Sequence, residues 1–115
     1  MYSILEDLNK TSLNIQASAL ISTDGLVIAS ALPKGMDEDT FGAVSAALNS
    51  VGTQSICELA GGALEHILIK STQNYILMAR AGKESILTVI IKSHDELENL
   101  LSNVKHAVDK MVLIA

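Results

Sequence analysis

The amino-acid sequence predicts an α+β sandwich in which helices cover both faces of an antiparallel sheet. Three segments place apolar residues at helical spacing, and five short runs between them are rich in apolar and β-branched residues. Their order is α-β-β-α-β-β-β-α, and helices that interrupt an antiparallel sheet are typical of α+β folds. Several runs, ILTVII among them, are apolar on both faces, so we expect helices on both sides of a five-stranded sheet. The length suits one domain, spanning 1–115.

The first helix is predicted over residues 2–14, where apolar residues recur at spacings of three and four. Two strands follow, at 17–24 and 25–32, with an Asp-Gly pair at the joint. Such a pair between apolar runs predicts a hairpin with a two-residue turn, because both central residues adopt positive φ. Asp24 is therefore interpreted as a turn residue and not as a catalytic carboxylate. Pro33 ends the second strand, since proline cannot donate to a ladder.

The middle helix is predicted to begin after Asp37 and to run to about Ala60. The Asp37 side chain can cap the free amides of the first turn, and the acidic residues Glu38 and Asp39 then lie at the positive end of the helix dipole. A Gly-Gly pair at Gly61 supplies the left-handed residue that ends many helices.

Three further strands are predicted at 63–70, 74–80 and 85–92, with turn sequences between them, and they form an antiparallel meander. Ser93 and Glu96 match a capping box at the start of the last helix. The apolar face of that helix comprises Leu97, Leu100, Leu101, Val104, Val108 and Met111.

The middle helix is the most informative segment, because Thr40 to Cys57 contains no charged side chain. It is too polar for a membrane span. One stripe of bulky residues is expected to pack on the sheet: Phe41, Val44, Leu48, Val51 and Leu59. A second face is small and lightly polar, with Ala43, Ala47, Ser50, Gln54 and Cys57 bordered by Gly42, Ala46, Asn49 and Thr53. We expect this face to meet the same helix of a second copy; the alternative is a helix buried twice within its own domain.

The composition argues against several classes of function. The net charge is −5 and the lysines are scattered, so neither nucleic acid nor an anionic membrane is an expected partner. Cys57 is the only cysteine, which fits a reducing compartment, and the acidic N-terminus does not resemble a signal peptide. These features predict a cytoplasmic protein without membrane insertion.

The sequence also lacks the familiar catalytic and cofactor motifs. It has no phosphate-binding loop, no nucleophile elbow and no metal-ligand spacing, since His66, His94 and His106 are far apart. Cys57 is interpreted as a packing residue. We therefore predict no catalytic residue, cofactor or metal, and no enzymatic activity.

Two stretches carry a family resemblance: ALISTDGLVIASALP, and GGALEHILIKSTQNYILMARAGKESILTVII followed by a terminal helix. They resemble the Roadblock/dynein light chain domain, above all its prokaryotic branch, often described as regulators of Ras-like GTPases. The resemblance implies a roadblock/profilin-like fold, with the first and last helices on one face of the sheet and the middle helix on the other. It also implies homo- or heterodimers, in which the middle helices lie side by side and the third strands join into one sheet.

Specific residues follow from this resemblance together with the uncharged helix. The expected dimer interface comprises Ala43, Ala46, Ala47, Ser50, Gln54, Cys57, Leu64, His66 and Leu68. The expected partner-binding residues are Asp37, Glu38, Asp39, Gly42 and Asn49. Some relatives stimulate GTP hydrolysis, and Arg80 is the one arginine that could act in trans, although a structural role is the commoner one.

The leading hypothesis is a non-catalytic homodimeric platform that binds and regulates a small Ras-like GTPase. A second hypothesis is a monomeric domain that senses a small molecule in an apolar cavity between sheet and helix. A third is a structural subunit of a larger assembly, such as a motor or scaffold light chain.

Overall fold

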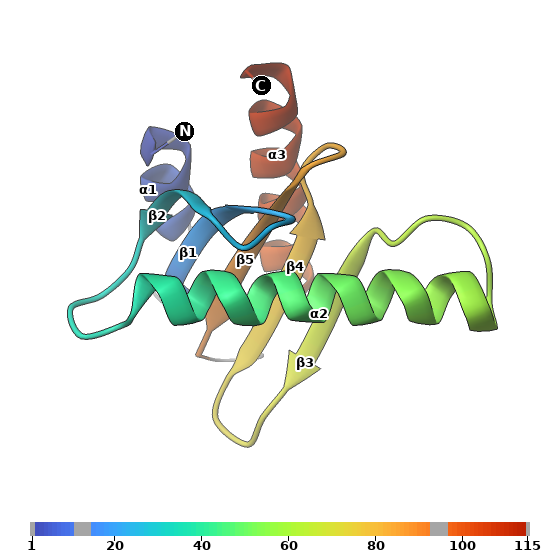
Figure 1. Cartoon of the computed structure of the whole chain (residues 1–115). Coiled ribbons are helices and arrows are strands. Elements are labelled where there is room, and N and C mark those ends of the chain that lie inside the picture. The colour runs from blue at the N-terminus through green and yellow to red at the C-terminus, as the bar shows by residue number, and fades with distance from the viewer. Residues whose placement is uncertain (1, 11–14, 93–96, 115) are drawn as a thin grey trace.

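The computed structural model describes residues 2–10, 15–92 and 97–114 of the chain. It confirms the predicted order of three helices and five strands (Figure 1). The elements are α1 (Tyr2–Lys10), β1 (Ile15–Ser22), β2 (Val27–Ala31), α2 (Glu38–Leu59), β3 (His66–Lys70), β4 (Tyr75–Arg80), β5 (Ser85–Ile91) and α3 (Leu97–Ile114). The end predicted for the first helix and the capping box predicted before the last helix lie outside the described residues.

The five strands form one antiparallel sheet in the order β2-β1-β5-β4-β3, so β2 and β3 are its two edges. The meander predicted for the last three strands is confirmed, since β4 pairs with both β3 and β5. The two edges differ in regularity. Strand β3 pairs with β4 over five consecutive residues without a shift, whereas β2 carries a bulge because Leu20 pairs with Ala29 but Ile21 pairs with Val27.

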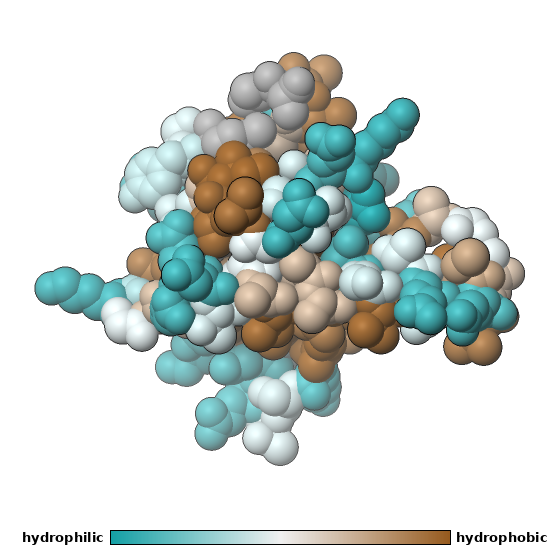
Figure 2. Space-filling view, viewed as in Figure 1, coloured by the Kyte–Doolittle hydropathy of each residue, from teal (hydrophilic) through white to brown (hydrophobic). Residues whose placement is uncertain are grey.

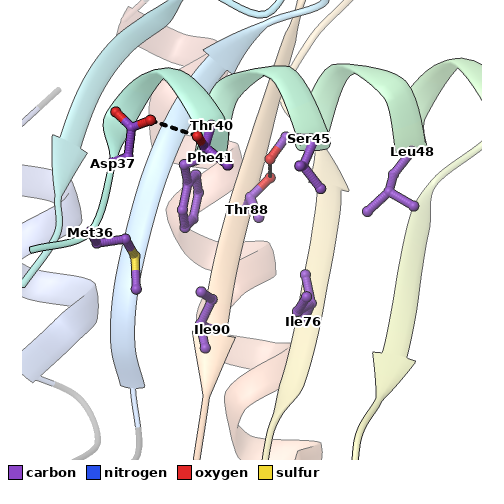
Figure 3. Close-up of a pocket in the computed structure, with 10 residues that line it drawn as sticks. Met36, Asp37, Thr40, Phe41, Ser45, Leu48, Ile76, Thr88 and Ile90 are labelled. Atoms are coloured by element: carbon purple, nitrogen blue, oxygen red, sulfur yellow. Dashed lines mark hydrogen bonds between the residues drawn. The ribbon is translucent and has the colours of Figure 1, made fainter.

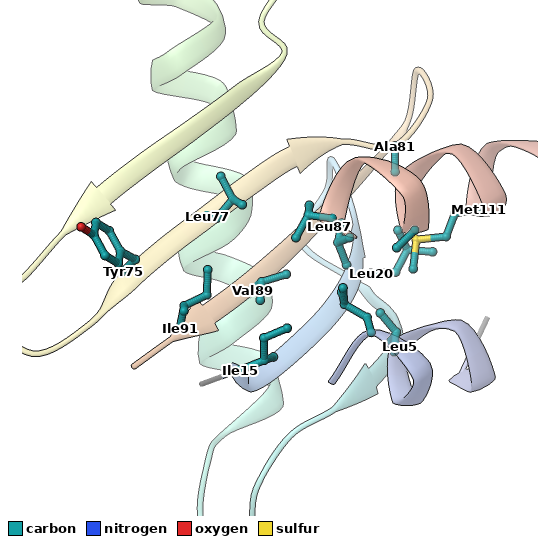
Figure 4. Close-up of a cluster of buried hydrophobic side chains, with 13 residues drawn as sticks. Leu5, Ile15, Leu20, Tyr75, Leu77, Ala81, Leu87, Val89, Ile91 and Met111 are labelled. Atoms are coloured by element: carbon teal, nitrogen blue, oxygen red, sulfur yellow. The ribbon is translucent and has the colours of Figure 1, made fainter. Parts of the chain in front are cut away.

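Helices cover both faces of the sheet, as predicted. Helix α2 crosses the front of the sheet, and α1 and α3 lie behind it (Figure 1). The main hydrophobic core lies on the α1/α3 side, where Leu5, Leu20, Leu87 and Met111 are each at most 2% exposed (Figure 4). The apolar face predicted for α3 contributes to it: Val104 and Met111 are buried, and Leu101 and Val108 pack against the cluster.

The β1–β2 turn differs from the two-residue turn that the Asp-Gly pair predicts. Ser22 donates its N–H to the Leu26 carbonyl at 2.8 Å, and Gly25 donates to the Ser22 carbonyl at 2.9 Å. The loop therefore has three residues, with a turn centred on Thr23 and Asp24. Within this loop Gly25 has a left-handed φ, of +94°, whereas Asp24 does not, since no non-glycine residue in the described part of the chain has a positive φ. This combination of a turn and a following left-handed residue is a common hairpin connection.

Candidate functional site

The start of α2 is fixed by its N-cap, as predicted. The Asp37 carboxylate accepts from the Asp39 N–H at 3.3 Å and from the Thr40 hydroxyl at 2.5 Å. The hydrogen bond from Thr40, supported by the backbone N–H groups of residues 39 and 40, holds the pKa of the Asp37 carboxyl below its usual value, although desolvation opposes this. Asp37, Glu38 and Asp39 are all exposed, so this acidic turn is accessible to a partner.

Small residues bring α2 close to the sheet. Gly42 is buried, and a Cβ atom there would lie within 3.0 Å of the Gly25 carbonyl oxygen. One turn further, the Thr88 hydroxyl donates to Ser45 Oγ at 3.0 Å, and both side chains are buried. Asn49 follows on the same face and is 7% exposed. Gly42 and Asn49 are therefore buried on the sheet-facing side of α2 and not at the border of an exposed face, and their role in partner binding stays a prediction.

The bulky stripe of α2 is correspondingly only partly buried, and the prediction that it packs on the sheet is wrong for Val44, Val51 and Leu59. Val44 is 49% exposed, Val51 63% and Leu59 86%, while Phe41 and Leu48 are half-buried. The physical reason is the close approach of the helix, which leaves room for glycine and serine against the strands but not for a branched side chain. Exposed valines without neighbouring charges on a helix are a feature of contact surfaces.

An apolar groove runs between this stripe and the sheet. It has a volume of about 280 Å³. Figure 3 shows Phe41 and Leu48 extending from α2 toward the strands, with Ile76 and Ile90 on β4 and β5 below them. The Ser45–Thr88 hydrogen bond lies in its wall, so the polar groups there are already paired. The groove is suited to apolar side chains.

The groove continues toward the edge of the sheet. A neighbouring hollow is lined by the same Ile76 and Ile90 together with Ile69 of β3, which is 37% exposed. Figure 2 shows apolar side chains along this flank of α2. We call this surface the α2–β3 face and define it by Val44, Leu48, Val51, Ile69 and Ile76. Sequence reasoning assigned the β3 edge of this face to a dimer, but it expected Val44, Leu48 and Val51 to pack on the sheet.

The residues expected at a dimer interface lie on several surfaces. Ala43, Ala47, Ser50, Gln54 and Cys57 are exposed on α2, and Ala46 is half-buried against Gly25. Leu64 is half-buried before β3, and His66 and Leu68 are exposed on the β3 edge strand. All of these except Ala46 and Leu64 are accessible, so their role in an interface stays a prediction.

Arg80 is held by its own hairpin. Its Nη2 donates to the Lys83 carbonyl at 2.7 Å, in the turn between β4 and β5. In residues 2–10, 15–92 and 97–114 no group of three His, Cys, Asp or Glu side chains could hold a metal ion. Within the same ranges, none of the helices combines the length and apolarity needed to cross a bilayer.

An antiparallel sheet with two helices behind it and one long helix in front defines the roadblock/profilin-like class of α+β fold. The chain belongs to the Roadblock/LC7 domain family, whose model matches residues 3–91. It is 35% identical over 108 residues to the uncharacterized protein MJ0310 of Methanocaldococcus jannaschii, covering 94% of this chain and 93% of the relative.

Two solved structures show the same fold. MglB of Myxococcus xanthus superposes with a TM-score of 0.91 at 18% identity, over 98% of this chain and 92% of MglB. A Roadblock/LC7 domain from Streptomyces avermitilis superposes with a TM-score of 0.90 at 18% identity, over 96% of this chain and 92% of that one. These likenesses confirm the fold class and the resemblance predicted from the sequence.

Proposed function

We propose that this protein is a non-catalytic homodimeric platform that binds and regulates a small Ras-like GTPase. The observation that carries the dimer is the α2–β3 face beside a regular sheet edge. The GTPase partner rests on membership of the Roadblock/LC7 family and on the resemblance to its prokaryotic branch.

The β3 edge supports pairing between two copies. An edge strand presents unpaired N–H and C=O groups, and proteins usually protect it with charges, bulges or a short strand. Strand β2 has the bulge, whereas β3 is regular and presents Leu68 and Ile69, which are 40% and 37% exposed. An antiparallel pair of β3 strands satisfies the backbone groups and covers both side chains.

The exposed stripe of α2 supports the same arrangement. A twofold axis beside β3 places the α2 of the second copy antiparallel to the first, against Val44 and Val51 and over the groove. This moves the helix contact from the small face predicted from the sequence to the bulky stripe. The apolar surface that is exposed in one chain is then covered by its equivalent.

The acidic turn at the start of α2 supplies the accessible edge on which the GTPase is proposed to dock, through Asp37, Glu38 and Asp39. Any effect on hydrolysis is expected to come from repositioning the loops of the GTPase. Arg80 is not placed to reach into the active site of a GTPase, because its guanidinium donates a hydrogen bond to the Lys83 carbonyl of its own hairpin.

The dimer is tested by Leu68→Lys, with Leu26→Lys as a matched control. Both leucines are exposed, at 40% and 71%, but Leu26 lies beside the bulged edge. We expect Leu68→Lys to convert the protein to a monomer in sedimentation-velocity runs at micromolar concentration and Leu26→Lys to leave the dimer intact. A monomeric parent protein would refute the dimer and favour a monomeric ligand-sensing domain.

The GTPase partner is tested separately. The parent protein, immobilised, is expected to retain at least one small Ras-like GTPase from the same organism, in the GTP-loaded or the GDP-loaded form. If none is retained in either form while the dimer persists, the partner assignment is wrong and a structural assembly subunit becomes the better description.

A further inference from the structure

A second candidate site lies on the opposite flank of α2 from the α2–β3 face. We propose that this polar pocket binds a carboxylate group presented by an acidic segment of a protein partner, with Arg80 and Lys83 as its anchors. Its volume is about 560 Å³, and its lining includes Thr23, Asn49, Ser50, Thr53, Arg80 and Lys83. We call it the Arg80 pocket.

The Arg80 pocket is remote from the proposed dimer contact. Arg80 pairs with Ile86 at one end of β4, whereas Ile76, which lines the apolar groove, pairs with Ile90 toward the other end. On α2, the lining residues Asn49 and Thr53 belong to a different flank from Val44 and Val51. The pocket therefore remains accessible when a second copy covers the α2–β3 face, and the inference does not depend on the proposed GTPase.

The guanidinium of Arg80 is preorganised but incompletely paired. Its Nη2 is fixed to the Lys83 carbonyl at 2.7 Å, and its Nε is buried without a hydrogen-bond partner among the described residues. A buried N–H group that lacks an acceptor destabilises the site, and a charged one does so more strongly. A carboxylate is the acceptor that best matches a guanidinium, because its two oxygens align with two N–H groups.

Asn49 provides a second unpaired group in the same pocket. The side chain is 7% exposed and its Oδ1 has no partner within the described part of the chain. Because Oδ1 is an acceptor, it can take an N–H from the bound peptide segment but does not itself bind the carboxylate. The hydroxyls of Thr23, Ser50 and Thr53 add further donors around the pocket.

The charges that line the pocket favour an anion. Arg80 and Lys83 are cationic, and the one carboxylate in the lining, Glu58, accepts from Gln54 Nε2 at 3.2 Å. The side chains that line the pocket therefore carry a net charge of +1, whereas the whole chain carries a net charge of −5. An acidic peptide segment is complementary to it, whereas the rest of the protein repels such a segment.

The test uses the fact that Arg80 is the only arginine in the sequence, so the protein gives a single arginine Nε–H signal in a 15N-correlated NMR spectrum. The full-length protein is titrated with hexaglutamate, with hexaglutamine as the uncharged match and with inorganic phosphate as a second anion, at ~0.15 M ionic strength to limit non-specific attraction. We expect hexaglutamate alone to shift the Arg80 Nε–H signal in a saturable manner. An unmoved signal, or an equal shift with hexaglutamine or phosphate, overturns the proposal.

Charge variants then locate the binding. Arg80→Lys is expected to weaken hexaglutamate binding about tenfold, since the paired N–H groups are lost. Lys83→Gln leaves the arginine in place and is expected to weaken binding about threefold, as for a partly exposed ion pair. Lys70→Gln makes the same charge change at the opposite end of the β3–β4 hairpin and should leave binding unchanged. If Lys83→Gln and Lys70→Gln weaken hexaglutamate binding equally, the peptide is attracted by lysine side chains in general and not by the Arg80 pocket.

Discussion

The close contact between α2 and the β1–β2 turn makes Gly42→Ala a sharp test of the fold. The added Cβ would lie within 3.0 Å of the Gly25 carbonyl oxygen and 3.2 Å from Val27 Cγ2. That oxygen belongs to a residue whose own N–H is bound to the Ser22 carbonyl at 2.9 Å, so the turn cannot easily give way. The helix has to move instead.

The expected magnitude follows from two opposing effects. Overpacking against backbone costs about 3 kcal/mol, the upper end of the usual range. Alanine is the better helix former in Gly42→Ala, by about 1 kcal/mol, so the free energy of unfolding should fall by about 2 kcal/mol. For a chain of this length that corresponds to a decrease in melting temperature of roughly 8 °C.

Gly52→Ala is the matched control. Its Cβ would meet Ile67 Cδ1 at 2.6 Å, but this is the flexible end of a side chain and can turn aside. The gain in helix propensity should offset the remaining strain, so the melting temperature should stay within about 2 °C of the parent. Circular-dichroism melts at equal protein concentration measure both, because a dimer melts in a concentration-dependent way. If Gly42→Ala melts at or above the parent temperature, the description of how α2 packs is wrong.

Three further predictions concern the same helix. Ser45→Ala leaves the Thr88 hydroxyl buried without its partner and should lower the free energy of unfolding by about 1–2 kcal/mol in urea titrations, and adding Thr88→Val should restore much of the loss. Asp37→Ala should lower the melting temperature at pH 7. Because folding depresses the pKa of Asp37, the difference from the parent should begin to shrink below about pH 3.9 and vanish only as the pH passes through the lower pKa of the folded state; a constant difference would contradict the capping role. Val51→Lys should dissociate the proposed dimer in light scattering while Ala47→Lys leaves it intact, and the reverse result would return the contact to the small face of α2.

Local signals in the sequence predicted the element boundaries well where one residue decides the geometry. Asp37 caps α2, and Gly61 ends it with a φ of +107° and an N–H bonded to the Ile56 carbonyl at 2.6 Å. The Asp-Gly pair located the β1–β2 hairpin but not its loop length. The bulge opposite Ile21 changes the register of β2, and pairing across a sheet is not visible in a two-residue motif.

The orientation of α2 was not predictable from hydrophobic periodicity alone. That reasoning assumes that bulky residues face the core, and it assigned Val44 and Val51 to the sheet. In the structure, the short distance between helix and sheet determines which face of α2 lies against the strands, because only small side chains fit beside the backbone of the Gly25 turn. The relevant signal was the spacing of Gly42, Ser45, Asn49 and Gly52 by three and four residues, which marks a face of close approach. The Arg80 pocket had no signal of this kind, since it combines α2 with two distant turns.

The irregularity in β2 sets a limit on stoichiometry. If two chains join through β3, the outermost strand at each end of the extended sheet is β2. Because β2 carries a bulge, it is a poor hydrogen-bonding partner for a strand of a third chain. We therefore expect the proposed dimer not to extend into a polymer by further strand addition.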